Sequence, residues 1–146
     1  MLINLIQRIA AMADKIQMHP ILFYDGNCGF CNRSIQFILA QERNEEIHFC
    51  ALQSPLAQKE LECAEINTQD LSTIYFKRQA IILSKSSAVF AILPFLKWYW
   101  QPLRIFQYMP KKWTDNLYNF IAKRRMKLAS SFCVIPSARQ MERFLK

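Results

Sequence analysis

The chain has 146 residues, of which 52% are hydrophobic, and a formal net charge of +8. This length fits one domain with its own core, and the hydrophobic share excludes an intrinsically disordered chain. Its five cysteines are an odd number, which excludes a fully paired secreted disulfide scaffold within one chain, so we expect a reducing, cytoplasmic location.

The first segment, residues 1–19, is predicted to form a short amphipathic helix that docks on the domain or on a partner. A signal peptide is the alternative, although no basic region precedes the apolar residues. No apolar run in the chain reaches the roughly eighteen residues of a membrane span. The helical spacing is carried by Leu2, Leu5, Ile6, Ile9, Met12, Ala13 and Ile16.

The next segment reads as a buried strand over residues 21–24, a turn over residues 25–27 and a helix that continues to about Gln41. The only two glycines of the chain, Gly26 and Gly29, lie here. Glycine is required where the backbone needs a positive φ or a close approach to another group. We therefore expect a specially shaped backbone at this turn.

Cys28 and Cys31 are predicted to lie at the start of that helix, one turn apart. Unpaired N–H groups at a helix start carry partial positive charge, which stabilises a thiolate. We expect Cys28 to be an exposed attacking thiolate and Cys31 the resolving thiol. Half of a zinc site and two unrelated buried cysteines remain alternatives, although a strand before the pair and a helix after it favour redox chemistry. Asp25 is either a turn residue or the acceptor of the Cys31 proton.

The remaining elements follow in the order strand, helix, strand, strand, helix. We expect strands over residues 47–51, 72–76 and 80–83, with a turn over 77–79 between the last two. Helices are expected from near Leu56 to Cys63, opened by Ser54-Pro55, from a Ser86 or Ser87 cap to about Lys97, and over residues 113–127. The order predicts an α/β, thioredoxin-like fold in which helices flank a four-stranded mixed sheet. Residues 20–146 would form this single domain, and residues 95–146 a helical, basic and aromatic extension.

The aromatic residues of this extension are expected to be core rather than a ligand-binding box. Charge is divided unevenly along the chain: residues 1–73 hold five Lys/Arg and nine Asp/Glu, whereas residues 74–146 hold fourteen and two. Such asymmetry indicates an acidic partner or an anionic surface for the second half.

The stretch from Tyr24 to Asn32 resembles the signature of the DCC family of predicted thiol–disulfide oxidoreductases, named for its Asp-x-x-Cys-x-x-Cys core. The resemblance implies a thioredoxin-like fold and disulfide chemistry, but it does not supply a substrate. We expect exchange with a protein or a low-molecular-weight thiol or disulfide, and no cofactor. Weaker matches follow at Leu52-Gln53-Ser54, at residues 84–88, at Tyr118, Ala122 and Arg124-Arg125, and at Cys133 with Pro136.

One departure concerns the proline that thioredoxins place before their third strand. This chain has residues 70–73 there and no proline between Pro55 and Pro94. The backbone of residues 71–73, with Lys85 and Ser86, is the candidate to face the sulfurs instead.

Two other functions remain open beside thiol–disulfide exchange. A nucleic-acid or membrane-surface adaptor could use the basic, aromatic second half. Among the other cysteines, Cys50 is expected in the core and Cys63 without chemistry, while Cys133 is either packed or a third thiol. A zinc-binding module would join Cys28 and Cys31 to two of Cys50, Cys63, Cys133, His48 and His19.

Overall fold

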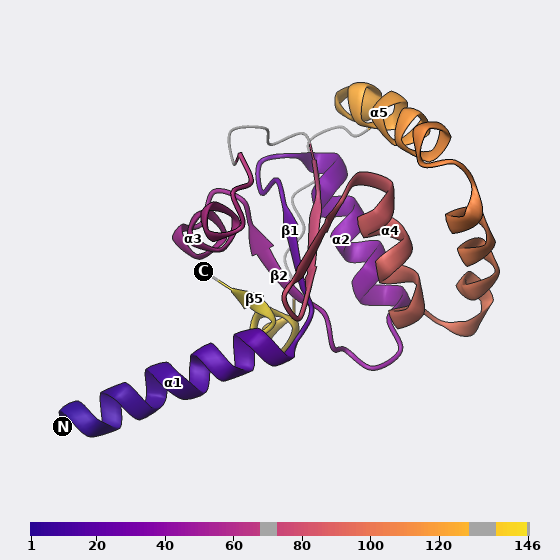
Figure 1. Cartoon of the computed structure of the whole chain (residues 1–146). Helices are drawn as coiled ribbons and strands as arrows, with labels where there is room; N and C mark the ends of the chain where they lie inside the picture. Colours follow the sequence, from indigo (N-terminus) through magenta and orange to yellow (C-terminus); the bar gives the residue numbers. More distant parts are fainter. Residues whose placement is uncertain (68–72, 129–136, 146) are drawn as a thin grey trace.

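The computed structural model describes residues 1–67, 73–128 and 137–145, with the backbone alone for residues 12–18, 125, 126 and 128. Figure 1 shows the helices and strands in sequence colours. The helices are α1 (Leu2–Met18), α2 (Gly29–Gln41), α3 (Pro55–Cys63), α4 (Lys85–Ile92), α5 (Lys111–Leu128) and α6 (Ala138–Met141), with 3₁₀ helices η1 (Leu93–Phe95) and η2 (Trp98–Tyr108). The strands are β1 (Ile21–Tyr24), β2 (His48–Ala51), β3 (Tyr75–Arg78), β4 (Ile81–Ser84) and β5 (Phe144–Leu145).

The strands form one mixed sheet in the order β4-β3-β1-β2-β5. Strand β1 runs parallel to β2 and antiparallel to β3, and β3 and β4 form an antiparallel hairpin. The order β1-α2-β2-α3-β3-β4-α4 confirms the predicted thioredoxin-like arrangement. Strand β5, parallel to β2, is a fifth strand that the sequence analysis did not anticipate.

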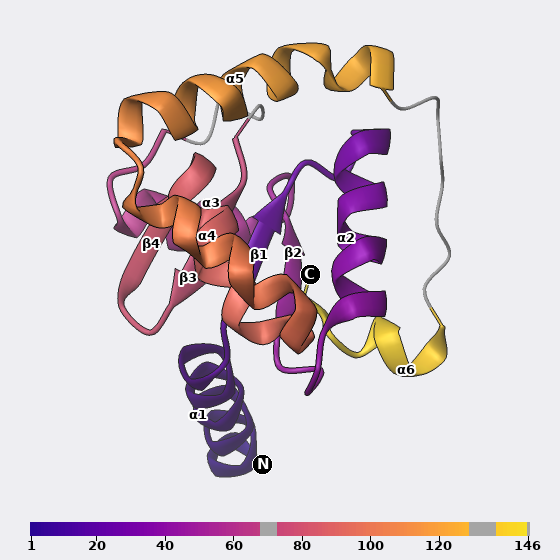
Figure 2. The same ribbon diagram turned by 90° about the vertical axis from the view of Figure 1, so that its right-hand side faces the viewer.

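Each face of the sheet has its own apolar core, because successive side chains of a strand point to opposite faces. Leu22 and Tyr24 of β1 face the core formed with α2 and α4, whereas Ile21 and Phe23 face the core formed with α3. Figure 2 looks onto the side that carries α2 and α4, with α5 across one end. The two faces therefore confirm the expectation of helices on both sides of the sheet.

Two local expectations are corrected. The hairpin turn lies at Gln79 and Ala80, not at residues 77–79, and Gln79 has a φ of 55° that suits a tight turn. Helix α4 begins at Lys85 with Ser84 as its N-cap residue and without a side-chain cap, so Ser86 and Ser87 lie inside the helix, where the hydroxyl of Ser86 donates to Thr114 and Asp115. Ser54, by contrast, caps α3 by accepting from the backbone N–H of Ala57.

Helix α1 projects away from the domain (Figure 1). The side chains of Leu2, Ile3, Leu5, Ile6 and Ile9 are exposed, so the expectation that this helix docks on the domain is wrong for the side chains that are described. A partner for its apolar stripe stays a prediction. No helix in the described part of the chain is long and apolar enough to cross a bilayer.

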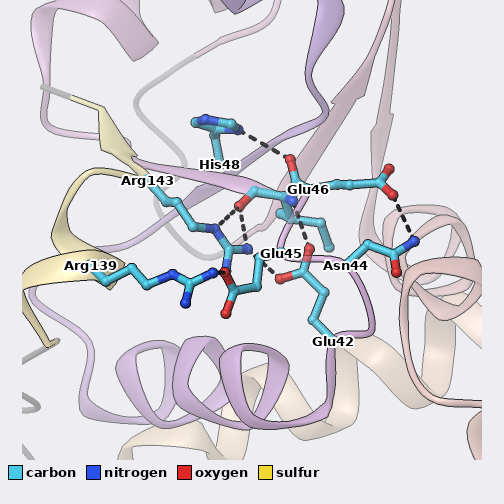
Figure 3. Close-up of polar contacts among 8 residues, drawn as sticks. Glu42, Asn44, Glu45, Glu46, His48, Arg139 and Arg143 are labelled. Atoms are coloured by element: carbon cyan, nitrogen blue, oxygen red, sulfur yellow. Dashed lines mark hydrogen bonds and ion pairs between the residues drawn. The ribbon is translucent and has the colours of Figure 1, made fainter.

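The C-terminal residues return to the sheet, although they lie within the expected helical extension. Arg143 Nε donates to the carbonyl oxygen of Ile47 at 2.9 Å, and its guanidinium pairs with the buried carboxylate of Glu42 (Figure 3). Glu42 Oε1 in turn accepts from the backbone N–H of Ile47 at 2.7 Å. The ring of Phe144 stacks on Phe49 with centroids 5.2 Å apart. The Arg143–Glu42 pair therefore fastens this last described segment to the start of β2.

Residues 98–128, which comprise η2, its connection and α5, are named here the outer arm. The arm starts at the C-terminal end of α2, where Gln41 Oε1 accepts from Trp100 Nε1 at 3.2 Å and from the Tyr99 hydroxyl. The ring of Phe37 packs edge-on against the ring of Trp100, with the ring centroids 5.0 Å apart. Helix α5 then packs on α4 and α2. The arm thus lies outside the two helices that cover this face of the sheet (Figures 1 and 2).

We predict that Arg143→Met lowers the free energy of unfolding by about 3–5 kcal/mol, because it leaves the Glu42 carboxylate buried without its partner. Arg139→Met is the matched control, since Arg139 pairs with Glu45 at side-chain exposures of 82% and 50%. Such exposed pairs contribute about 0–1 kcal/mol. Urea unfolding of both variants measures the difference. An equal decrease in the free energy of unfolding for the two variants would contradict a stabilising role of the buried Arg143–Glu42 pair.

Candidate active site

The two cysteines lie where the parallel strands β1 and β2 end, at the same edge of the sheet. The turn after β1 closes when the N–H of Cys28 donates to the carbonyl oxygen of Asp25 at 3.2 Å. Asp and Asn favour such turns because their short side chains bond to the nearby backbone. The strand, turn and helix of the sequence analysis are therefore confirmed.

Cys28 is the N-cap residue of α2, with extended backbone angles and its sulfur turned back toward the helix. Its Sγ accepts from the backbone N–H of Cys31 at 3.4 Å, and its carbonyl oxygen accepts from Asn32 N at 3.0 Å. The sulfur thus takes the position in which a serine or aspartate oxygen usually satisfies a helix N-terminus. Cys28 and Cys31 are not joined by a disulfide in this structure.

Both cysteines are buried: Cys28 is 3% exposed and Cys31 is 6% exposed. The expectation of an exposed Cys28 thiolate is therefore wrong for this conformation. The physical reason is that the sulfur turns inward to cap the helix and joins the apolar core that contains Tyr24 and Ile35. A substrate disulfide reaches either sulfur only when neighbouring side chains move.

Asp25 is also buried and holds the turn together. Its Oδ1 accepts from the backbone N–H of Asn27 at 3.0 Å and from Gln53 Nε2 at 2.7 Å. Gln53 Oε1 accepts from the backbone N–H of Gly26 at 3.1 Å. The Asp25–Gln53 pair therefore ties the turn after β1 to the loop after β2. This network agrees with a turn residue and leaves a proton-accepting role of Asp25 as a proposal.

Gly26 lies in this turn at a position with little room for a side chain. A Cβ at Gly26 would lie 3.2 Å from Gln53 Oε1 and 3.3 Å from the Cβ of Ala51. Neither glycine has a positive φ. At Gly26, a close approach to Gln53 and Ala51 is therefore the reason for a glycine.

An apolar cavity of about 520 Å³ lies beside Cys31, between α2, α4 and the outer arm. Cys31 forms part of its wall, and Cys28 does not. Leu103 of η2 and Tyr118 and Ala122 of α5 close its far side. The Tyr118 hydroxyl also accepts from the backbone N–H of Ile74 at 3.1 Å, which fixes α5 over the start of β3.

The sequence analysis did not foresee this cavity. The available signal was the match of Tyr118 and Ala122 to a late motif of the family, which gave no reason to place them beside Cys31. That placement depends on how α5 folds back.

The other candidate residues divide between core and surface. Cys50 is buried, which confirms its expected core position. Its Sγ lies 3.0 Å from Ser54 Oγ. Burial raises the pKa of the Cys50 thiol, and the hydrogen bond with Ser54 partly offsets this rise. Burial also raises the pKa of the Tyr24 hydroxyl, with a smaller contribution from Cys50. Cys63 is exposed. Cys133 and residues 70–72 lie outside the described residues.

The hydroxyl of Ser86 donates to Thr114 and Asp115 of α5. An approach of Lys85 and Ser86 to the sulfurs stays a prediction. Within residues 1–67, 73–128 and 137–145, no group of three or more His, Cys, Asp or Glu side chains is placed to hold a metal ion.

Comparison with known proteins gives a consistent result. The sequence profile of the DCC1-like thiol-disulfide oxidoreductases matches residues 22–131. The chain is 32% identical over 127 residues to the uncharacterized protein YuxK of Bacillus subtilis, covering 86% of this chain and 93% of that protein. It is also 32% identical over 107 residues to the chloroplastic DCC family protein At1g52590 of Arabidopsis thaliana, covering 73% of this chain and 62% of that protein. No solved structure matches the chain.

The profile covers the β1 strand, the Cys28–Cys31 turn, the rest of the sheet up to α4, and α5 with its cavity-lining residues. By its sequence and by the placement of its two cysteines at the start of α2, the chain belongs to the DCC1-like thiol-disulfide oxidoreductase family.

Proposed function

We propose that the protein is a dithiol–disulfide oxidoreductase in which Cys28 is the nucleophile and Cys31 the resolving thiol. The observation that carries this proposal is the hydrogen bond from the Cys31 N–H to Cys28 Sγ at the start of α2. A thiolate at that position receives a backbone donor and the positive end of the helix dipole. Membership of the family supports thiol–disulfide chemistry in general, and the assignment of roles is our inference.

The reaction consists of two exchanges. The Cys28 thiolate attacks one sulfur of the substrate disulfide, forms a mixed disulfide and releases the other sulfur as a thiolate, which takes up a proton. Cys31 then loses its proton and attacks Cys28 Sγ, which releases the second substrate thiol and leaves a Cys28–Cys31 disulfide. Two electrons pass from the dithiol to the substrate, and the reverse sequence oxidises a substrate dithiol.

We assign the acceptance of the Cys31 proton to Asp25. Its carboxylate lies in the same turn as Cys28, and Gln53 and Asn27 hold it in place. An ionised carboxylate in a fixed position is a suitable general base for thiol deprotonation.

The substrate is a protein or a small molecule that carries a disulfide beside apolar groups. The support for this is the cavity at Cys31, whose wall is formed mainly by aliphatic and aromatic side chains. A highly charged thiol would gain little from that wall, because apolar surfaces bind by excluding water.

We predict that the wild-type chain forms a Cys28–Cys31 disulfide in glutathione buffers of increasing oxidised fraction. Cys28→Ser abolishes exchange, whereas Cys31→Ser accumulates a mixed disulfide with glutathione, because the resolving thiol is gone. Alkylation followed by mass spectrometry identifies each species.

Cys63→Ser is the matched control, since Cys63 is an exposed thiol on another helix and its loss leaves exchange unchanged. Absence of the intramolecular disulfide over the whole buffer range would remove the proposed function. A mixed disulfide that accumulates in Cys28→Ser instead would reverse the two roles.

We predict that Asp25→Asn slows the decay of the mixed disulfide by about 10²-fold near neutral pH, the typical contribution of a positioned general base. The asparagine keeps an oxygen acceptor for Asn27 N but loses the basic carboxylate. Stopped-flow mixing with a fluorescent disulfide substrate measures the decay.

Gln53→Ala is the comparison variant, because it removes the bonds to Asp25 and Gly26 while it keeps the carboxylate. A proton-accepting Asp25 predicts a larger effect for Asp25→Asn than for Gln53→Ala. The opposite order would show that Asp25 only shapes the turn.

A further inference from the structure

Helix α5 turns a stripe of apolar side chains toward solvent and bonds to the domain through polar side chains on its other side. Trp113, Leu117, Phe120 and Ile121 follow one another at helical spacing and are all exposed. The opposite side carries Asp115, which together with Thr114 accepts hydrogen bonds from the Ser86 hydroxyl, and Tyr118, which accepts from Ile74 N. The expectation that the aromatic residues of the extension are core is therefore wrong for Trp113 and Phe120 of this helix.

The exposed apolar surface continues along η2. Trp98 is 76% exposed, Tyr108 is 82% exposed and Trp113 is 67% exposed, and the aliphatic Ile105 between them is exposed as well. The arm contributes eleven of the large hydrophobic side chains that are exposed in the described part of the chain. An apolar patch of this extent is uncommon on a monomer and marks an interaction surface.

The charges of the arm are almost all positive. Residues 98–128 contain seven Lys/Arg and one acidic residue, Asp115, whose carboxylate accepts from Ser86 on the inner side. Lys112, Lys123 and Arg124 are exposed beside the apolar stripe, and the guanidinium of Arg124 lies 4.2 Å from the centroid of the Phe120 ring. Cations and exposed apolar groups therefore lie on the same surface.

We propose that the outer arm is a docking surface for an anionic phospholipid bilayer, on which α5 and η2 lie in the plane of the interface. An amphipathic helix with bulky apolar residues on one face and flanking cations inserts its apolar face at the headgroup boundary. Tryptophan and tyrosine favour that boundary because their rings are amphipathic. Anionic headgroups complement the cations.

The chemistry of the arm favours a bilayer over a nucleic acid. Phosphate backbones attract Lys and Arg, and aromatic rings stack on bases, but neither contact uses the exposed aliphatic side chains of Ile105, Leu117 and Ile121. A hydrocarbon interface buries those side chains together with the aromatic ones. The inference depends on the arm alone and does not require the dithiol chemistry.

Docking would also bring the cavity near the lipid. Leu103 and Ile121 line the cavity beside Cys31 and are at the same time among the exposed residues of the arm. The wall that separates the cavity from solvent at this point is therefore part of the proposed docking surface.

Tryptophan fluorescence tests the proposal directly, because all three tryptophans of the chain, at positions 98, 100 and 113, belong to the arm. The full chain is mixed with vesicles of phosphatidylcholine alone or with phosphatidylglycerol added. We expect a blue-shifted emission and protection from acrylamide with the anionic vesicles, and little change with the neutral ones. Helix α1 has no tryptophan, so its own binding to lipid would not produce this signal.

Two pairs of variants separate charge from apolar contact. The double variant Lys112→Gln, Lys123→Gln is expected to lower the vesicle partition coefficient by about 30-fold. Each cation near an anionic surface contributes about 1 kcal/mol, and each 1.4 kcal/mol corresponds to about a tenfold change in affinity. Leu117→Ser with Phe120→Ser is expected to lower it by at least about tenfold.

The controls are the exposed Lys59→Gln on α3 and the exposed Ile81→Ser on β4, both expected to bind as the wild type does. All six side chains are exposed, so the circular dichroism spectrum and unfolding midpoint stay unchanged.

Several outcomes would overturn the proposal. No emission shift with anionic vesicles at low ionic strength is one, and vesicle binding that the four arm substitutions leave intact is another. A larger shift with duplex DNA or RNA at lower concentration would assign the arm to nucleic acid. A stable dimer with its tryptophans already shielded would assign it to self-association.

Discussion

The hydrogen bond from the Cys31 backbone to the Cys28 sulfur is the interaction on which the arrangement of this site depends. It requires a helix that begins shortly after a strand, with the first cysteine as the cap of the helix and the second cysteine one turn later. The tight turn between strand β1 and helix α2 is held by Asp25 and Gln53, and it leaves little room for a side chain at Gly26. The arrangement of the two cysteines is thus defined by backbone geometry as much as by the sulfurs.

That geometry carries a consequence for access. A sulfur that caps a helix inside an apolar core is well positioned for exchange with its neighbour and is shielded from outside partners. The cavity beside Cys31 is a space in which an apolar group could lie, and residues of the outer arm form part of its wall. Access to the dithiol and the position of the arm are therefore linked by shared side chains.

Buried polar contacts decide where the outlying segments lie. The Glu42–Arg143 pair fastens the chain end beside β2, and the contacts of Ser86 and Tyr118 fix which side of α5 faces the domain. Hydrogen bonds to buried groups are directional and costly to leave unmade, so a few of them can outweigh the preference of an apolar stripe for the core. This explains why α5 shows its tryptophan, leucine and phenylalanine to solvent.

Patterns in the sequence were enough to predict the local elements: the β1 strand, the turn, the cysteines at the start of α2, the helix opened by Ser54-Pro55 and the order that gives a thioredoxin-like sheet. These follow from side-chain periodicity and from turn chemistry between residues close in the chain. The burial of Cys28, the addition of β5 to the sheet, the cavity lined by the arm and the outward apolar face of the arm became visible only in the folded chain. Each of these depends on contacts between residues far apart in the sequence, such as Arg143 with Glu42, Asp115 with Ser86 and Tyr118 with Ile74, and an apolar stripe alone does not specify which surface it meets.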